Sequence, residues 1–210
     1  MIDLYTWTTP NGRKVPILME ELGVPYRLRP VDLGKDEQFA PAFLAISPNN
    51  KIPAIVDPDA PGGPLPIFES GAILIYLADK HGQFLPPGGA ARWKALEWLF
   101  WGIGGLGPML GQLYFFSSRA PERLPLAIDR FTAEAARLLG VMDRRLGEAD
   151  YLAGDYSIAD IAAYPWVAMA TEFMPEELAE RWSRMAHARR WFDAVGARPA
   201  VQRGMAVLKD

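Results

Sequence analysis

The chain has 210 residues, half of them hydrophobic, and a formal net charge of −3 at pH 7. A chain of this length can bury an ample core as one large domain or two small ones. The slightly acidic balance, without a long basic run, argues against a surface built for nucleic-acid phosphates or anionic lipid, so we expect neither nucleic acid nor a membrane as a partner. No stretch approaches the roughly 20 apolar residues that span a bilayer, and residues 1–5 carry no basic leader, which together predict a cytoplasmic protein.

The sequence contains no cysteine and only two histidines, His81 and His187. The absence of cysteine excludes disulfides within the chain, thiolate metal sites and a thiol nucleophile of the protein's own. A metal site built on several histidines is poorly supported, and we expect no metal. Any thiol chemistry must therefore use the sulfur atom of a ligand.

The first 80 residues alternate between strand and helix patterns. The predicted elements are, in chain order, a strand over 2–7, a helix over 11–22, a strand over 26–31, a short helix or irregular turn over 37–46, strands over 54–56 and 65–68, and a helix over 70–80. The first two strands are parallel if the helix between them is a right-handed crossover. The order β-α-β-α-β-β-α is that of a thioredoxin-like domain.

The rest of the chain has helical patterns only. Helix breakers gather in residues 84–90, which form the predicted linker. Long apolar stripes then predict helices over 92–116, 120–146, 157–173 and 184–195. We therefore expect an α/β plus all-α protein, with a thioredoxin-like domain at 1–83 and an all-helical C-terminal bundle at 91–210.

Ser157 and Asp160 fit the capping-box pattern at the start of the third of these helices. The Ser157 hydroxyl is expected to accept the N–H of Asp160 while the carboxylate reaches back to the cap. We interpret this pair as structural, with no part in chemistry.

Two motifs indicate peptide binding. The first is Ile52-Pro53 at the start of a predicted strand, where proline removes a ladder donor and makes a cis peptide bond accessible, leaving the Ile52 backbone open to an added strand. The second is Glu69-Ser70 at the start of a predicted helix, where N–H groups and the positive helix end favour a carboxylate. Each alone could be a plain strand end or N-cap. Together they indicate a site for a small peptide with an acidic amino-acid end.

This combination resembles the glutathione-binding half of the glutathione transferases. Residues 9–14, 31–34, 46–57, 98–101 and 104–112 look like the Nu class of bacterial glutathione transferases, so the resemblance spans nearly the full chain. It implies a homodimer that binds glutathione, reduced or as its disulfide, and uses it to reduce small-molecule disulfides. Transfer of glutathione to electrophiles and peroxide reduction are the weaker activities that it implies.

The resemblance places the sulfur at the loop formed by residues 7–12, between the first strand and the first helix, where open α/β sheets usually hold ligands. Transferases stabilise the glutathione thiolate by donating hydrogen bonds to it. Thr9 and Asn11 are the candidate donors. Tyr5 is the alternative, because several transferase classes use a tyrosine near the N-terminus, but its place inside a strand gives it a sheet role just as readily.

The resemblance assigns these residues to the captured peptide: Gln38, Lys51, Ile52, Pro53, Glu69 and Ser70. The cysteinyl backbone would meet Ile52, the γ-glutamyl end Glu69 and Ser70, and the glycyl carboxylate or peptide Gln38 and Lys51. Arg130 matches a family position that reaches the ligand from the partner subunit, although an arginine on a helix is most often solvated or ion-paired.

Residues 98–114 need a separate interpretation, because their helical pattern contains several glycines that each cost up to roughly 1 kcal/mol relative to alanine. Close helix packing at a dimer interface or domain junction could compensate for that cost. A kink could instead open a second-substrate pocket lined by Trp101, Met109 and Tyr114. Both interpretations can hold together.

The sequence thus favours an enzyme, a glutathione-dependent disulfide reductase and transferase. The alternative is a non-catalytic module that binds glutathione or a protein through a transferase-like fold. A dithiol redox protein of the glutaredoxin type is excluded by the lack of a Cys-x-x-Cys motif.

Overall fold

The computed structural model describes residues 1–173 and 175–208, which form two compact units. The first unit comprises Met1–Leu85 together with the segment that begins at Arg198, and the second comprises Pro86–Ala197. Among the described residues, the helices are all too short or too polar to cross a bilayer.

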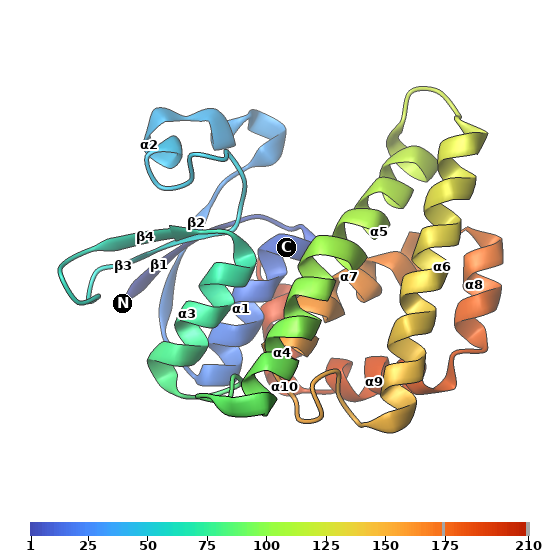
Figure 1. Cartoon of the computed structure of the whole chain (residues 1–210). Coiled ribbons are helices and arrows are strands. Elements are labelled where there is room, and N and C mark those ends of the chain that lie inside the picture. The colour runs from blue at the N-terminus through green and yellow to red at the C-terminus, as the bar shows by residue number, and fades with distance from the viewer. Residues whose placement is uncertain (174, 209–210) are drawn as a thin grey trace. The chain divides into compact units, whose positions relative to one another are not determined.

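A four-stranded sheet forms the centre of the first unit (Figure 1). Its strands β1 (Ile2–Thr6), β2 (Tyr26–Pro30), β3 (Ala54–Asp57) and β4 (Leu65–Phe68) lie in the order β2-β1-β3-β4. β1 and β2 are parallel, as predicted, and β3 is antiparallel to both of its neighbours. The sheet is that of a thioredoxin-like domain, which confirms the fold expected for this half of the chain.

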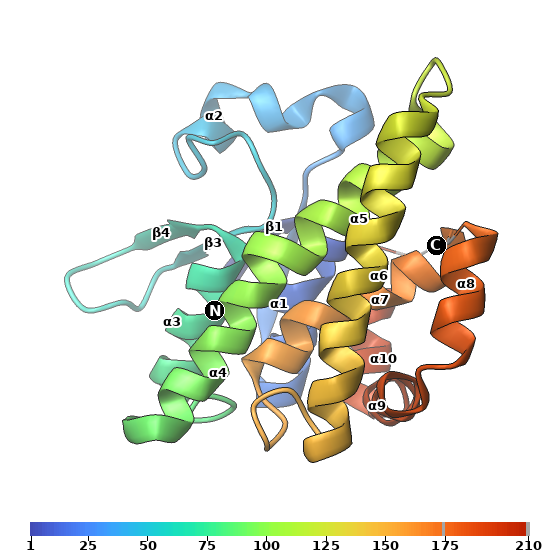
Figure 2. The same cartoon turned by 45° about the vertical axis from the view of Figure 1, so that its right-hand side comes forward.

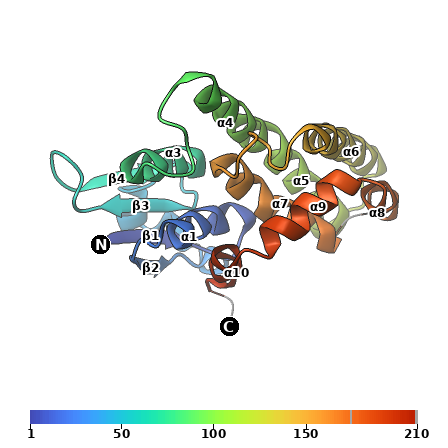
Figure 3. The same ribbon diagram turned by 90° about the horizontal axis from the view of Figure 1, so that it is seen from below.

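Helices lie on both sides of this sheet. α1 (Pro10–Leu22) and α3 (Ser70–His81) pack against each other on one side (Figures 1 and 3), whereas α2 (Pro41–Leu44) lies on the other (Figure 1). Two single-turn 3-10 helices over Leu33–Lys35 and Glu37–Phe39 lead into α2. The start of α1, which follows β1, and the start of α3, which follows β4, therefore lie at the carboxyl ends of strands, where ligand-binding loops emerge.

A helix that the sequence analysis did not predict, α10 (Pro199–Ala206), belongs to the first unit. It packs on α1 so closely that a Cβ added to Gly204 would lie 2.5 Å from the Cα of Ile17. Arg198 also makes a bidentate ion pair with the buried Glu21, at 2.6 and 2.9 Å. The sequence-based boundaries placed these residues in the helical domain, because a helix of eight residues gives no sign of its distant packing partner.

We expect Gly204→Ala to lower the free energy of unfolding by about 1–3 kcal/mol, because the added methyl group overlaps the α1 backbone rather than a flexible side chain. Gly140→Ala is the matched control. Gly140 lies within a long helix with no atom closer than 3.9 Å to an added Cβ, so that change should raise stability by up to about 1 kcal/mol. Urea denaturation of both variants measures the difference, and equal effects would contradict the tight α1–α10 contact.

Within its described residues, the regular elements of the second unit are all helices (Figure 2). Its helices are α4 (Gly89–Trp101), α5 (Gly107–Tyr114), α6 (Pro125–Glu148), α7 (Ile158–Phe173), α8 (Glu176–Ser183) and α9 (Ala186–Gly196). The all-helical prediction is confirmed. α8 was not predicted, because Leu178 is its one buried side chain and the rest of the helix has no apolar stripe.

The glycine-rich run continues the helix instead of breaking it. π-helical turns over Gly102–Leu106 join α4 to α5, and a second π-helical segment, Phe115–Arg119, follows. A Cβ at Gly107 would lie 2.7 Å from the indole Nε1 of Trp166, and one at Gly111 would lie 3.2 Å from the same ring. Close packing against α7, a helix of the same unit, therefore accounts for these two glycines.

The capping box at the start of α7 is present with one difference. The Asp160 carboxylate accepts the N–H of Ser157 at 3.0 Å, as predicted, but the Ser157 hydroxyl accepts the N–H of Ala159 at 3.3 Å and not that of Asp160. The indole of Trp191 also donates to Asp160, at 2.8 Å. Burial raises the pKa of Asp160 to about 6, although the hydrogen bonds that it accepts act to lower this pKa. Ser157 and Asp160 are both buried, so the capping box is part of the core.

Candidate functional site

A cavity of about 280 Å³ lies in the first unit where the turn before β3 meets the starts of α1 and α3. Its lining combines one amide from α1, the turn residues, the last residue of β4 and the first of α3. The lining residues are Asn11, Ser47, Asn49, Lys51, Ile52, Pro53, Phe68, Glu69 and Ser70. The two predicted motifs, Ile52-Pro53 and Glu69-Ser70, therefore face the same space.

The turn before β3 is held by its own polar groups. Ser47 donates its hydroxyl to the Lys51 carbonyl at 2.8 Å, and the Asn50 N–H donates to the Ser47 carbonyl at 2.9 Å. The Ile52-Pro53 peptide bond is cis, as predicted. In the described part of the chain, no backbone hydrogen bond joins Ile52 to another residue, so an extended peptide can pair with its N–H and C=O.

The Ile52 side chain is held in place by packing against neighbouring hydrophobic residues. It packs in a buried cluster with Val31, Phe43 and Ala54, and Tyr5 lies against this cluster with its ring 6.1 Å from that of Phe43. These contacts make the backbone of Ile52 a rigid edge. They also give Tyr5 a packing role, which favours the loop residues over Tyr5 as sulfur donors.

The start of α3 presents an anion site to the cavity. Glu69, the N-cap residue, has a positive φ of 69° and makes no side-chain cap, so the first N–H groups of the helix remain for a ligand. Asn49 holds the Glu69 carboxylate through a hydrogen bond of 3.4 Å. The exposed Glu69 carboxylate suits an ammonium group, while the Ser70 hydroxyl and the helix end suit a carboxylate.

The loop before α1 positions Thr9 and Asn11. Thr9 is the N-cap of α1, and its hydroxyl oxygen accepts the N–H of Gly12 at 3.1 Å, which leaves its hydrogen to be donated. Thr6 Oγ1 donates to the Gly12 carbonyl at 2.7 Å and ties the loop to β1. Asn11 lines the cavity, whereas Thr9, two residues earlier at the N-cap, is not among the lining residues.

Lys14 was not predicted as a site residue, yet it lies directly behind the cavity. It is only 1% exposed, and its ammonium donates to Ser70 Oγ at 3.5 Å. Burial lowers the pKa of Lys14 to about 8, although the charge of Glu69 acts in the opposite direction. The signal in the sequence was a charged residue on the apolar face of α1, next to Val15 and four residues before Leu18.

We expect Lys14→Met to raise the free energy of unfolding at pH 7 by up to about 3 kcal/mol, the value of a pKa depressed from 10.5 to about 8. Between about pH 8 and pH 10.5, the pKa values of Lys14 in the folded and the unfolded chain, the unfolded chain binds more protons than the folded one. The stability of the wild type should therefore rise with pH across this window, and its deficit against Lys14→Met should vanish above it. Urea unfolding from pH 7 to 11 measures this, and a constant difference would contradict it.

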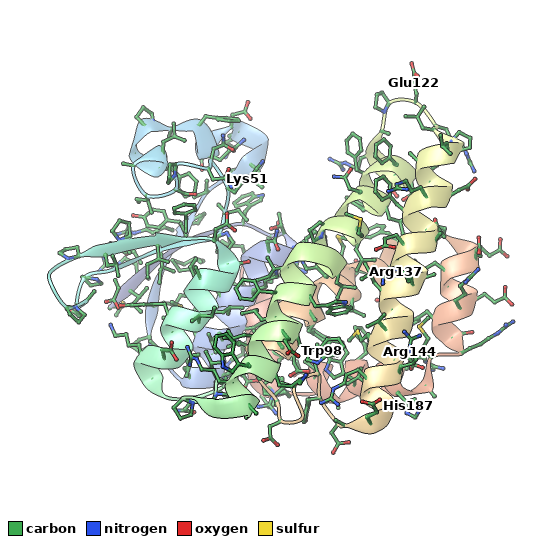
Figure 4. The ribbon with its side chains drawn as sticks, in the orientation of Figure 1. Lys51, Trp98, Glu122, Arg137, Arg144 and His187 are labelled. Atoms are coloured by element: carbon green, nitrogen blue, oxygen red, sulfur yellow. The ribbon has the colours of Figure 1, made fainter. Side chains whose placement is uncertain are left out.

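The other predicted residues occupy different places. Lys51 is exposed on the turn before β3 (Figure 4). Gln38 lies in the 3-10 turn before α2, where it donates to Asp36 at 3.2 Å while its buried Oε1 lacks a partner. Arg130 is exposed on α6 of the second unit, where its charge acts on Glu134. The roles given to these three residues stay predictions.

The aromatic residues predicted for a second substrate lie in the second unit. Tyr114 lines a cavity of only about 10 Å³, room for about one water molecule, and its ring is 5.1 Å from that of Phe173. Trp101 packs edge-on against Trp98, with ring centroids 5.1 Å apart, and Met109 is half-buried in α5. A pocket shared by Trp101, Met109 and Tyr114 stays a prediction.

Ser47, Asn49 and Phe68 also line the cavity without having been predicted as site residues. Ser47 and Asn49 lie just before the Ile52-Pro53 motif, in a stretch whose residue types are typical of a turn. The sequence therefore did not indicate that they line the cavity. Among the described residues, no group of three or more acidic or histidine side chains could hold a metal ion.

The fold and the site define a thioredoxin-like unit with a cavity suited to a small peptide, followed in the chain by a helical unit. Comparison with known proteins agrees with this architecture. The family model for the glutathione S-transferase N-terminal domain matches residues 8–80, and that for the C-terminal domain matches residues 112–199. The chain belongs to the glutathione S-transferase family.

Individual relatives match nearly the full chain. It is 48% identical to the disulfide-bond oxidoreductase YfcG of Escherichia coli, with 100% of this chain and 95% of that protein covered. A glutathione transferase from Burkholderia graminis, crystallised with two glutathione molecules per subunit, superposes with a TM-score of 0.94 at 46% identity, covering 99% and 88% of the two chains. A transferase from Pseudomonas putida with one glutathione disulfide per subunit gives 0.91 at 43% identity, covering 99% and 91%.

Proposed function

We propose that this protein is a glutathione-dependent disulfide-bond reductase that also transfers glutathione to electrophiles. The observation that carries the proposal is the single cavity that brings together Asn11, the cis turn at Ile52 and the Glu69-Ser70 helix start. The relatives add support, because the Escherichia coli protein is named a disulfide-bond oxidoreductase and the superposed transferases hold glutathione or its disulfide.

The residues around the cavity fit an extended tripeptide. The Ile52 backbone would pair with the cysteinyl residue as an added strand, which fixes the direction of the peptide. Glu69 would then bind the γ-glutamyl ammonium, and Ser70 with the start of α3 would bind its carboxylate. Lys51 and Gln38 would serve the glycyl end, and Arg130 would come from a second subunit.

This orientation brings the ligand sulfur to Thr9 and Asn11. A free thiol has a pKa near 8.5, so a shift of about two units, worth about 2.7 kcal/mol, would make it mostly thiolate at neutral pH. The Thr9 hydroxyl and the Asn11 amide supply neutral donors for that purpose, next to the positive end of α1. The chain has no thiol of its own, so its contribution is orientation and stabilisation of charge.

The thiolate attacks one sulfur of a disulfide, and a new S–S bond forms as the old one breaks. The departing thiolate takes a proton from solvent. A second glutathione thiolate attacks the mixed disulfide, which releases the second thiol and glutathione disulfide. Two glutathione molecules are thus oxidised for each disulfide reduced.

Two measurements test the proposal. Titration calorimetry with reduced and oxidised glutathione measures binding, and reduction of 2-hydroxyethyl disulfide in the presence of glutathione measures turnover. We expect binding of both forms and reduction well above the rate without protein. Binding without turnover would favour the non-catalytic module instead, and no binding at millimolar glutathione would contradict the function altogether.

We also propose a homodimer, and the cytoplasmic location stays a prediction. Two aromatic side chains seven residues apart on α4, Trp93 and Phe100, are 67% and 59% exposed, as expected of a face that a second copy covers. Size-exclusion chromatography with light scattering should give twice the chain mass of 23.3 kDa. A monomer at micromolar concentration would contradict both the dimer and the role given to Arg130.

A further inference from the structure

Lys14 lies one side chain away from the cavity. It points from α1 to the first residue of α3, and its ammonium reaches Ser70 Oγ at 3.5 Å. Ser70 lines the cavity, whereas Lys14 stands behind it and is almost fully buried. Any effect of Lys14 on a ligand must therefore pass through Ser70 or through the charge itself.

The direction of this hydrogen bond is fixed by chemistry. An ammonium group carries only donors, so Ser70 Oγ must be the acceptor. With one lone pair of the oxygen engaged from behind, the hydroxyl hydrogen is left to be donated to a group inside the cavity. Lys14 thus sets the polarity of Ser70 as a donor, which is the polarity that a carboxylate ligand needs.

The charge of Lys14 lacks a counter-charge in contact. In the part of the chain that the structure describes, no carboxylate forms an ion pair with it, and the acidic group that acts on it is the exposed Glu69. Arg198, the N-cap residue of α10, and Arg203 within that helix are engaged with Glu21 and Glu20, elsewhere on α1. A buried ammonium of this kind is costly to the fold, and a ligand carboxylate on Ser70 would supply the missing negative charge.

We propose that Lys14 is a positioning residue for the ligand's amino-acid carboxylate, acting through the Ser70 hydroxyl and by its own buried charge. The inference rests on the proposed function, because it takes the γ-glutamyl end of glutathione as the group bound at Ser70. It adds a residue that touches neither the ligand nor the sulfur.

The test compares two ligands that differ only in the relevant carboxylate. Titration calorimetry measures the affinity of the wild type and of Lys14→Met for glutathione and for γ-aminobutyryl-cysteinyl-glycine, which lacks the α-carboxylate of the γ-glutamyl residue. We expect Lys14→Met to bind glutathione about 10- to 100-fold more weakly, as for the loss of a hydrogen bond to a charged group. Its affinity for the analogue should change less than about twofold. Lys94→Met, which alters an exposed lysine of α4, is the control.

Two further variants separate positioning from folding. Lys14→Arg keeps the charge and should restore preference for glutathione over the analogue. In a double-mutant cycle, Ser70→Ala and Lys14→Met should be non-additive, because each removes the same polarised donor. Urea unfolding of every variant ensures that only folded protein is compared.

Each outcome of these binding experiments either supports or overturns the role of Lys14. An equal loss of affinity for both ligands, or no loss for either, would overturn the role of Lys14 while leaving the proposed function intact. A wild type that binds neither ligand would overturn the proposed function, and the role of Lys14 with it. Selective loss for glutathione with recovery in Lys14→Arg supports the inference.

Discussion

Replacing Asn11 by Ala, or Thr9 by Val, should each lower glutathione-dependent reduction of 2-hydroxyethyl disulfide on the order of a hundredfold, the usual effect of removing one donor to a developing or stabilised anion. Asn11→Asp should be worse than Asn11→Ala, because it places a negative charge where the thiolate must form. The affinity for glutathione disulfide, which has no thiolate, should change little. That contrast separates stabilisation of the sulfur from capture of the peptide.

Thr9 needs its own control because it also caps α1. Its oxygen accepts the Gly12 N–H, so Thr9→Val removes a cap worth about 1 kcal/mol together with the proposed donor. Thr9→Ser keeps the oxygen and the hydrogen and should retain most of the activity. Thr8→Ala, at the exposed neighbouring position, should be neutral. Full activity in both Thr9→Val and Asn11→Ala would move the sulfur donor to another group.

Titration of the bound thiol gives a second measurement of the same effect. If Thr9 and Asn11 supply the stabilisation, the ultraviolet absorbance of the thiolate in the wild-type complex should rise at a pH about two units below that of free glutathione. In each variant the midpoint should move back toward the free value. An unshifted midpoint in the wild type would contradict thiolate stabilisation by this loop.

The first unit could be predicted in detail because its signals are local. The β-α-β pattern, the Ile52-Pro53 turn and the Glu69-Ser70 helix start each lie within a short stretch of sequence, and the structure places both motifs at one cavity. The role of Lys14 could not be predicted from the sequence, because it depends on contact with Ser70, which lies 56 residues away in the chain. A charged residue inside an apolar stripe was the one sign, and it resembles an ordinary interruption of the pattern.

For the second unit, the sequence predicted most of the helices but not how they pack against one another. Apolar stripes located α4 to α7, yet nothing in the run after Trp101 distinguishes π-helical turns from a kink. The reason for Gly107 became visible only with Trp166 against it, 59 positions later in the sequence. α10 shows the same limit, since its place beside α1 depends on the close approach of Gly204 to Ile17.

Gly12→Ala should abolish most of the activity and lower the free energy of unfolding by about 3 kcal/mol. An added Cβ would lie 2.0 Å from the Trp7 carbonyl oxygen and 2.7 Å from Thr6 Oγ1, so the loop that carries Thr9 and Asn11 must move. Its two hydrogen bonds, Thr6 to the Gly12 carbonyl and Gly12 to Thr9, would be lost with that movement. A displacement of about 1 Å at the reacting sulfur is enough for a hundredfold loss of rate.

Gly88→Ala is the matched control, because Gly88 has an extended backbone with φ of −175° and open space around its Cβ position. It should leave stability within about 0.5 kcal/mol of the wild type and activity unchanged. Urea unfolding and the disulfide-reduction assay, run on both variants, distinguish two ways in which Gly12→Ala can act. Lost activity with intact stability would mean that the loop shifts locally while the sheet and α1 hold. A Gly12→Ala variant with wild-type stability and activity would contradict the tight loop, and with it the placement of Thr9 and Asn11 beside the ligand sulfur.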